Sequence, residues 1–251
     1  GTGDASTPVV NLKGKELQIV NNGDGIRPVV DGEGIHRCIE TDSGENSNTL
    51  IEGFVFQNGA SDFGGGLFCR SSSPIFKQCA FNNNWASNNG GGIFVQFGSP
   101  IFENCTVENN EADYGGGMYI RETDASVRSC VIENNTASVK GGGLRCYIAD
   151  PTIDDVSFKD NLSLSEGGGA HLYQCDSAAF IDCSFWNNTT YSLGGGAANI
   201  TSQVSYVNCL FIGNRSTGES DGQGSGGALY CDNSDIDIDN CYLGGNISTT
   251  Y

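Results

Sequence analysis

The chain has 251 residues, of which 37 are glycine and only 5 are proline, and its net charge is −18. Glycine without a strict three-residue period excludes collagen, and an apolar content of 37% is sufficient for a folded core. Thirty acidic side chains against twelve basic ones would repel a phosphate backbone, so we expect no nucleic-acid partner.

The first part of the chain, residues 1–49, has no clear repeat and is expected to form irregular first coils. A strong repeat occupies residues 50–251, and we treat residues 1–251 as a single β-helix domain. A glycine run returns about every 26 residues, beginning at Gly64, Gly90, Gly115, Gly141, Gly167 and Gly194, with a Ser-Gly-Gly version at Ser225. The stretch before the last run is the longest of its kind and predicts a loop insertion at 215–224.

Apolar and polar side chains alternate inside each repeat, which predicts β-strands. Leu67 and Cys69 flank Phe68, for example, and the phase changes once at Gln78. We predict three short strands per repeat and about eight or nine coils of 25–27 residues. Because successive repeats run in the same direction and parallel crossovers are right-handed, the all-β chain is expected to form a right-handed parallel β-helix, which is a solenoid.

A cysteine and an asparagine recur at fixed places and are interpreted as structural ladders. The cysteine follows the start of each glycine run by 15 or 16 residues, with Val156 as the one replacement: Cys79, Cys105, Cys130, Cys183, Cys209 and Cys241. The asparagine comes five residues later: Asn84, Asn110, Asn135, Asn161, Asn188, Asn214 and Asn246. We expect buried free thiols, preceded by a turn residue in left-handed conformation. A residue needed once for chemistry has no reason to recur in every coil, so we expect none of these to be catalytic.

Two tetrapeptides in the repeats carry a family resemblance. They are Gly226-Gly227-Ala228-Leu229 and a Phe-x-x-Asn motif at Phe81 to Asn84, Phe158 to Asn161, Phe185 to Asn188 and Phe211 to Asn214. Both resemble the β-helix repeats of chlamydial polymorphic membrane proteins, over roughly Leu50 to Asn246. The resemblance implies a right-handed β-helix of a bacterial surface, but it implies little about activity, because adhesins, lyases and structural proteins share this fold.

The first strand of each repeat is expected to carry a face for a ligand or partner. Its outward positions hold rings and arginines: Phe68, Arg70, Phe94, Tyr119, Arg121, Arg145, Tyr147, His171 and Tyr173. Contiguous exposed rings usually mark a contact surface for sugar rings, another protein or an added segment. Stacking between coils would explain the same rings without any ligand, and both interpretations stay open on sequence alone.

A group of aspartates near the end of the repeats is a candidate calcium site. Its members are Asp232, Asp235, Asp237 and Asp239. Calcium is bound by carboxylate oxygens, but neither an EF-hand loop nor a glycine-rich calcium repeat is present, which favours a solvated acidic face. Apart from this candidate Ca²⁺, no cofactor is expected.

Two classes of function fit these observations. The leading hypothesis is a non-catalytic extracellular or cell-surface solenoid of structural or adhesin type, because the repeat is uniform and holds no unique catalytic set. The alternative is a polysaccharide-active lyase or hydrolase, or a glycan-binding module on the first-strand face. No apolar run reaches the roughly 18 residues of a membrane-spanning helix, so no transmembrane segment is expected.

The ends of the repeat array lead to an expectation about self-association. No polar cap or helix is visible at either end, and an open coil presents unpaired strands. We therefore expect coils of neighbouring chains to stack end to end and form a filament.

Overall fold

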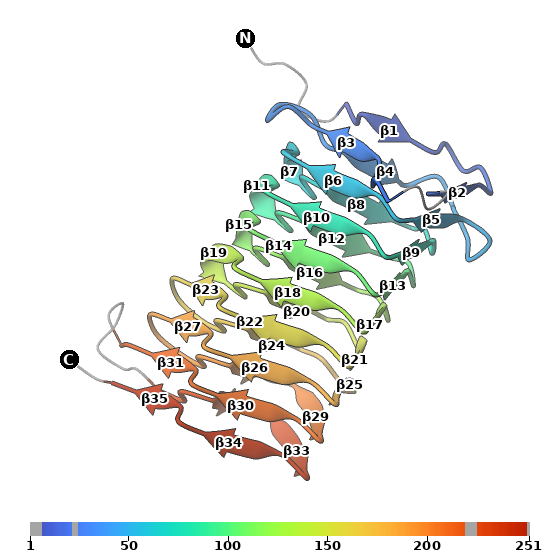
Figure 1. Ribbon diagram of the computed structural model, residues 1–251. Helices are drawn as coiled ribbons and strands as arrows, with labels where there is room; N and C mark the ends of the chain where they lie inside the picture. The colour runs from blue at the N-terminus through green and yellow to red at the C-terminus, as the bar shows by residue number, and fades with distance from the viewer. Residues whose placement is uncertain (1–6, 22–24, 219–224, 250–251) are drawn as a thin grey trace.

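The computed structural model describes residues 7–21, 25–218 and 225–249, and every regular element in these ranges is a β-strand. The strands stack along one axis as the coils of a solenoid, with the N-terminal strands at one end and the C-terminal strands at the other (Figure 1). Each regular coil contributes one strand to each of four parallel sheets, and the chain makes about eight turns. No helix in the described ranges is long and apolar enough to span a membrane.

The first two sheets lie next to each other in each coil. Sheet A consists of β1 (Val10–Asn11), β4 (Ile39–Thr41), β8 (Leu67–Arg70), β12 (Ile93–Gln96), β16 (Met118–Arg121), β20 (Leu144–Tyr147), β24 (Ala170–Tyr173), β28 (Ala197–Ile200) and β32 (Leu229–Asp232). Sheet B consists of β2 (Gln18–Val20), β5 (Leu50–Glu52), β9 (Ile75–Lys77), β13 (Ile101–Glu103), β17 (Ser126–Arg128), β21 (Thr152–Asp154), β25 (Ala178–Ile181), β29 (Gln203–Val207) and β33 (Asp235–Asp239).

The other two sheets complete the coil. Sheet C consists of β3 (Val29–Asp31), β6 (Val55–Gln57), β10 (Ala80–Asn82), β14 (Thr106–Glu108), β18 (Val131–Glu133), β22 (Ser157–Lys159), β26 (Ser184–Trp186), β30 (Leu210–Ile212) and β34 (Tyr242–Gly244). Sheet D consists of β7 (Ala60–Phe63), β11 (Trp85–Asn89), β15 (Glu111–Tyr114), β19 (Thr136–Lys140), β23 (Leu162–Ser163), β27 (Thr189–Thr190), β31 (Arg215–Ser216) and β35 (Ile247–Ser248).

Sheet D corrects the prediction of three strands per coil, because the structure has four. Its strands occupy the stretch between the asparagine and the glycine run, where polar side chains hide the alternation. The pairings of β11 and β15 contain register shifts, and β31 has only two residues. Of the predicted loop insertion at 215–224, residues 215 and 216 form β31, and residues 219–224 lie outside the described ranges.

The core consists of rings stacked between coils inside the solenoid. Phe81 stacks on Phe56 at 5.1 Å between ring centroids, and Phe185 stacks on Phe158 at 4.7 Å and on Phe211 at 4.5 Å. All five are at most 1% exposed. The inward phenylalanine of the Phe-x-x-Asn motif therefore supplies two aromatic stacks, which Val107 and Ile132 separate.

The cysteine position follows a tight turn between sheets B and C. The preceding residue has a positive φ in every repeat, at Gln78, Asn104, Ser129, Asp155, Asp182, Asn208 and Asn240, which confirms the predicted left-handed turn. Each of the first five repeated cysteines is at most 3% exposed, and Cys241 is partly exposed. All eleven cysteines are free thiols, so the ladder is held by packing and not by disulfides.

The asparagines form a buried hydrogen-bond ladder along the solenoid. The amide oxygen of Asn161 accepts from the backbone N–H and from Nδ2 of Asn135, each at 3.0 Å. Nδ2 of Asn161 donates to the Ile132 carbonyl at 2.8 Å and to the amide oxygen of Asn188 at 3.0 Å. The Asn161 side chain thus satisfies buried polar groups of the coils on either side, which gives the repeated asparagine a structural role.

The pairing of the last coil corrects the register of the seventh glycine run. Ser225 forms a bridge with Leu193, which immediately precedes a glycine run, and the first residue with positive φ is Gly226. The structural equivalent of Gly-Gly-Gly is therefore Gly226-Gly227-Ala228, one residue later than the predicted start at Ser225.

The asparagine ladder leads to a stability prediction. Replacement of Asn161 by alanine removes partners from the backbone N–H of Asn135, the Ile132 carbonyl and the Asn188 amide oxygen. Because a buried polar group without a partner costs about 1–3 kcal/mol, we expect the free energy of unfolding in urea to fall by about 3 kcal/mol. The control is Asn88→Ala at an exposed position, for which we expect a change within about 0.5 kcal/mol. Equal effects of the two variants would contradict the ladder's role.

Candidate functional site

The outer side of sheet A brings together all nine residues predicted for the binding face. One row in register contains Phe68, Phe94, Tyr119, Arg145 and His171, and a second row contains Arg70, Gln96, Arg121, Tyr147 and Tyr173. Rings within a row stack between coils, as Phe68 and Phe94 do at 5.2 Å and Tyr147 and Tyr173 at 5.5 Å. The structure therefore shows the stacking between coils and also places the nine side chains on one side of one sheet.

The expectation that the first row is exposed is wrong. Phe94 is only 4% exposed, Tyr119 and Arg145 are 6% exposed, and His171 is fully buried. The reason is that the chain turns back over sheet A at each glycine run. A Cβ at Gly141, for example, would lie 3.0 Å from Cβ of Arg145, so the backbone itself covers this row. The second row stays accessible, and in the first row only Phe68 remains half-buried.

A third row, which the sequence analysis did not identify, forms a wall beside these two. It contains the residue immediately before each glycine run: Phe63, Asn89, Tyr114, Lys140 and Glu166. Their constant position in the sequence, directly before each glycine run, is the signal from which this row could have been predicted. We call the surface made by the wall and the two rows of sheet A the sheet A groove.

A buried charged cluster lies at the C-terminal end of the sheet A groove. Nη1 of Arg145 donates to Nδ1 of His171, and Nε2 of His171 donates to Oε2 of Glu166 at 2.8 Å. Nζ of Lys140 lies 3.0 Å from the same Glu166 oxygen. Because arginine can only donate, Nδ1 of His171 must accept, and the imidazole is neutral with its proton on Nε2.

The pKa values of this cluster follow from burial and from the neighbouring cations. Burial and the Arg145 guanidinium lower the pKa of His171 to about 3, against the opposing effect of Glu166. Burial alone would raise the pKa of Glu166, but the hydrogen bond from His171 and the ammonium group of Lys140 outweigh it and hold this pKa well below its usual range. The cluster therefore contains two cations, one carboxylate and a neutral histidine.

Arg145 has no carboxylate partner within ion-pair distance among the described residues. Its guanidinium lies 5.8 Å from the ring centroid of Tyr114 and 5.9 Å from those of Tyr147 and Tyr173. Its Nε is buried and has no hydrogen-bond partner. The groove thus encloses a positive charge that has aromatic rings as close neighbours.

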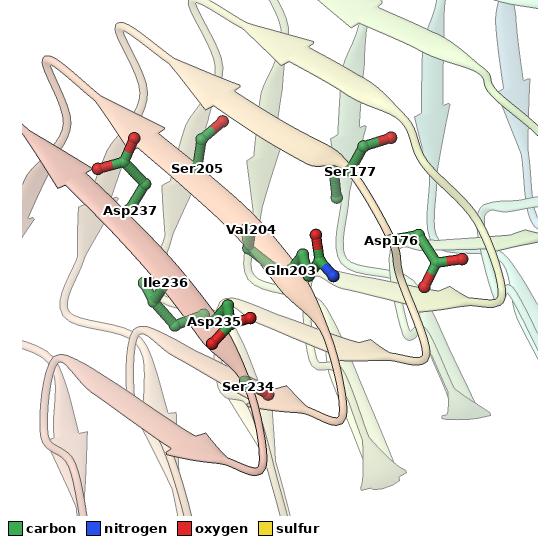
Figure 2. A pocket seen from close by; sticks show the side chains of 10 residues that line it. Asp176, Ser177, Gln203, Val204, Ser205, Ser234, Asp235, Ile236 and Asp237 are labelled. Atoms are coloured by element: carbon green, nitrogen blue, oxygen red, sulfur yellow. The ribbon is translucent and has the colours of Figure 1, made fainter.

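The predicted calcium residues lie elsewhere, near the C-terminal end. Asp235 and Asp237, together with Asp176, line an open hollow of about 550 Å³ on the outside of sheet B (Figure 2). Asp232 and Asp239 do not line it. Within the described ranges, no three His, Cys, Asp or Glu side chains gather closely enough to hold a metal ion. The structure therefore does not assemble the four aspartates into one site.

Comparison with known families agrees with the fold. The family described as the right handed beta helix region matches residues 36–144 and 114–249, and the chain belongs to this family. The match does not extend to the chlamydial type of repeat. No curated protein and no solved structure matches the chain.

The cluster leads to a prediction for the titration of His171. Because its folded-state pKa is lowered to about 3, we expect the ring to stay neutral, with the proton on Nε2, from pH 8 to about pH 4. Between pH 6.5 and about pH 3, the unfolded chain takes up a proton at this histidine and the folded chain does not. The free energy of unfolding therefore decreases as the pH falls through this range. Nitrogen-15 NMR of the ring, assigned by comparison with His171→Asn, measures the position of the ring proton and the pKa of His171. Titration near pH 6.5 would contradict the geometry.

Proposed function

We propose that this chain is a non-catalytic structural and adhesin-type solenoid of the cell surface or extracellular space, and that it binds an extended glycan along the sheet A groove. The observation that carries the proposal is the continuity of the groove over successive coils, with accessible rings at Phe63, Phe68, Tyr114, Tyr147 and Tyr173. The Phe-x-x-Asn and Gly-Gly-Ala-Leu resemblance to surface proteins supports the location.

The geometry of the groove favours a chain-like ligand. Its rows repeat once per coil, at the strand spacing of about 4.8 Å. A hexopyranose unit in an extended polysaccharide advances by a comparable distance, so successive sugar rings can meet equivalent positions. Aromatic side chains pack against the apolar C–H face of a sugar, and neighbouring amide and guanidinium groups of Gln96 and Arg121 can donate to its hydroxyl groups.

The arrangement of charges supports binding without turnover. A lyase of this fold needs carboxylate-bound calcium beside a basic residue, whereas here Asp235 and Asp237 lie on sheet B and Arg70 and Arg121 lie on sheet A. The one histidine in the groove, His171, is fully buried, and both of its ring nitrogens are engaged. It is therefore poorly placed to exchange a proton with a ligand.

A glycan array and a paired substitution test the binding function. We expect wild-type protein to bind extended oligosaccharides, and the double variant Tyr147→Ala/Tyr173→Ala to bind about tenfold more weakly, because two stacked and accessible rings are lost. The control is Trp186→Ala, which removes a ring that is 38% exposed on sheet C and should leave affinity unchanged. A wild-type protein that binds no glycan would refute the proposal.

A second candidate function, end-to-end assembly, is favoured by the last described coil. Ile238 is 47% exposed and Leu243 is 45% exposed, although their partners in the preceding coil, Tyr206 and Phe211, are fully buried. The outer edges of β32 to β34 have no partner strand within the described ranges. The opposite end begins with β1 to β3, so a second copy stacked head to tail would continue sheets A, B and C in the same parallel sense.

Electron microscopy and sedimentation test this assembly. We expect fibres with an axial repeat of about 40 Å, since about eight coils stack at about 4.8 Å each. Replacement of Ile238 and Leu243 by lysine should dissolve the fibres, because two charges would be buried at the junction. The control, Trp186→Lys on the side of the solenoid, should leave them intact. A wild-type protein that stays a monomer at high concentration would exclude the assembly.

A further inference from the structure

A hollow in the sheet A groove combines rings with accessible arginines. It has a volume of about 170 Å³, and its lining includes Phe63 from the wall, Phe68 from the first row, and Arg70 and Arg121 from the second row. The hollow spans β8, β12 and β16, so Arg70 and Arg121 are two coils apart, with Gln96 between them. Two strand spacings place the two backbones about 10 Å from each other, and both arginine side chains line the same hollow.

The rings of the hollow are only partly covered. Phe63 is 38% exposed, and Phe68 is half-buried, whereas Phe94 beneath them is only 4% exposed. Phe63 and Phe68 both pack on Phe94, with centroid distances of 5.5 and 5.2 Å. The buried ring therefore holds the two accessible ones in place, and the hollow has a preformed apolar surface.

The two arginines of the hollow are weakly paired. Arg70, whose side chain is 50% exposed, lies 3.8 Å from Asp42, beyond the usual hydrogen-bond distance. Arg121, whose side chain is 38% exposed, contacts Glu122 through Nε and Nη2, each at the long distance of 3.4 Å, and its Nε is buried. Arg70 therefore keeps its five donors for an anion, and Arg121 keeps those of Nη1 and one of Nη2. Arg37 and Arg70 lie over the Phe68 ring at 4.6 and 5.3 Å, and Phe94 stacks on it, so Phe68 presents its edge to a ligand. The charge of Arg37 is balanced by Glu40.

We propose that this hollow binds an acidic residue of the glycan, with the sugar ring against Phe63 and Phe68 and its carboxylate or sulfate group between Arg70 and Arg121. The inference rests on the proposed glycan-binding function and specifies the class of glycan. Carboxylate and sulfate share the property that their oxygen atoms accept paired, charge-assisted hydrogen bonds from a guanidinium group.

The net charge of −18 does not prevent this binding. At physiological salt, charges farther away than about 8 Å are largely screened, so the groups near the hollow dominate its potential. The carboxylates of Asp42 and Glu122 each face an arginine there. The accessible donors of Arg70 and Arg121, and not the net charge of the chain, are therefore what an anion meets in the hollow.

Calorimetry with matched oligosaccharides tests the inference. The probes are a tetramer of galacturonic acid, the methyl ester of the same tetramer, and a sulfated galactan tetramer. We expect at least one acidic tetramer to bind about tenfold more tightly than the ester, because the ester keeps the sugar ring and loses the charge. The preferred acidic tetramer identifies the anion as carboxylate or sulfate. Its affinity should also fall with added salt.

Substitutions in the hollow provide the second arm of the experiment. Arg70→Gln and Arg121→Gln should each weaken the preferred acidic tetramer about tenfold and leave the ester unchanged, and the double variant should lose most of the salt dependence. The control is Arg128→Gln, at an exposed position on sheet B, which should have no effect. Circular dichroism verifies that each variant is folded.

Four outcomes would overturn the inference, and they are distinguishable from failure of the function itself. Equal affinity for the ester and the acid would reject the acidic subsite but leave glycan binding intact. Unchanged affinity in both Arg70→Gln and Arg121→Gln would have the same consequence. An equal loss of affinity in Arg128→Gln would indicate nonspecific attraction to surface charge. No binding of any probe, together with an empty glycan array, would reject both the subsite and the proposed function.

Discussion

The structure depends on a close backbone approach at the first glycine of each run. A Cβ at Gly64 would lie 2.1 Å from the carbonyl oxygen of Leu67, and Gly64 has a φ of +59°, so no other residue fits without strain. Because that space is empty, the segment before the glycine can turn back against the outer side of sheet A. The wall of the sheet A groove and the burial of its first row both follow from this one steric condition.

The same turn determines the electrostatics of the groove. It places Glu166 against His171 and brings Lys140 to Glu166, at a depth where an unpaired charge would be costly. The imidazole of His171 stays neutral and accepts from Arg145, so one cation is stabilised without a carboxylate in contact. Charges near the second row remain partly in water. The groove thus separates a buried structural cluster from accessible groups that can meet a ligand.

The roles of residues that recur at constant spacing were predictable, because equivalent positions in successive coils have the same turn geometry and the same packing. Cys79 and Asn84 show this, as does the left-handed turn at Gln78. The nine residues of the predicted face also meet on sheet A, since alternation assigns them to one side of the strand. The fourth strand was missed because Trp85–Asn89 lacks alternation and its pairing shifts register, so its conformation is specified by the coils on either side.

The sequence by itself determined the solenoid, its period and the inward and outward sides of three sheets, because these follow from local alternation and from a repeated steric need. Only the tertiary structure decided which outward residues are covered. Tyr119 and Arg70 both point away from the core, but Tyr119 is buried and Arg70 is exposed. The difference arises because burial on the outer side depends on how far the preceding strand folds back, and this distance is set by contacts between segments and not by the pattern within any one of them.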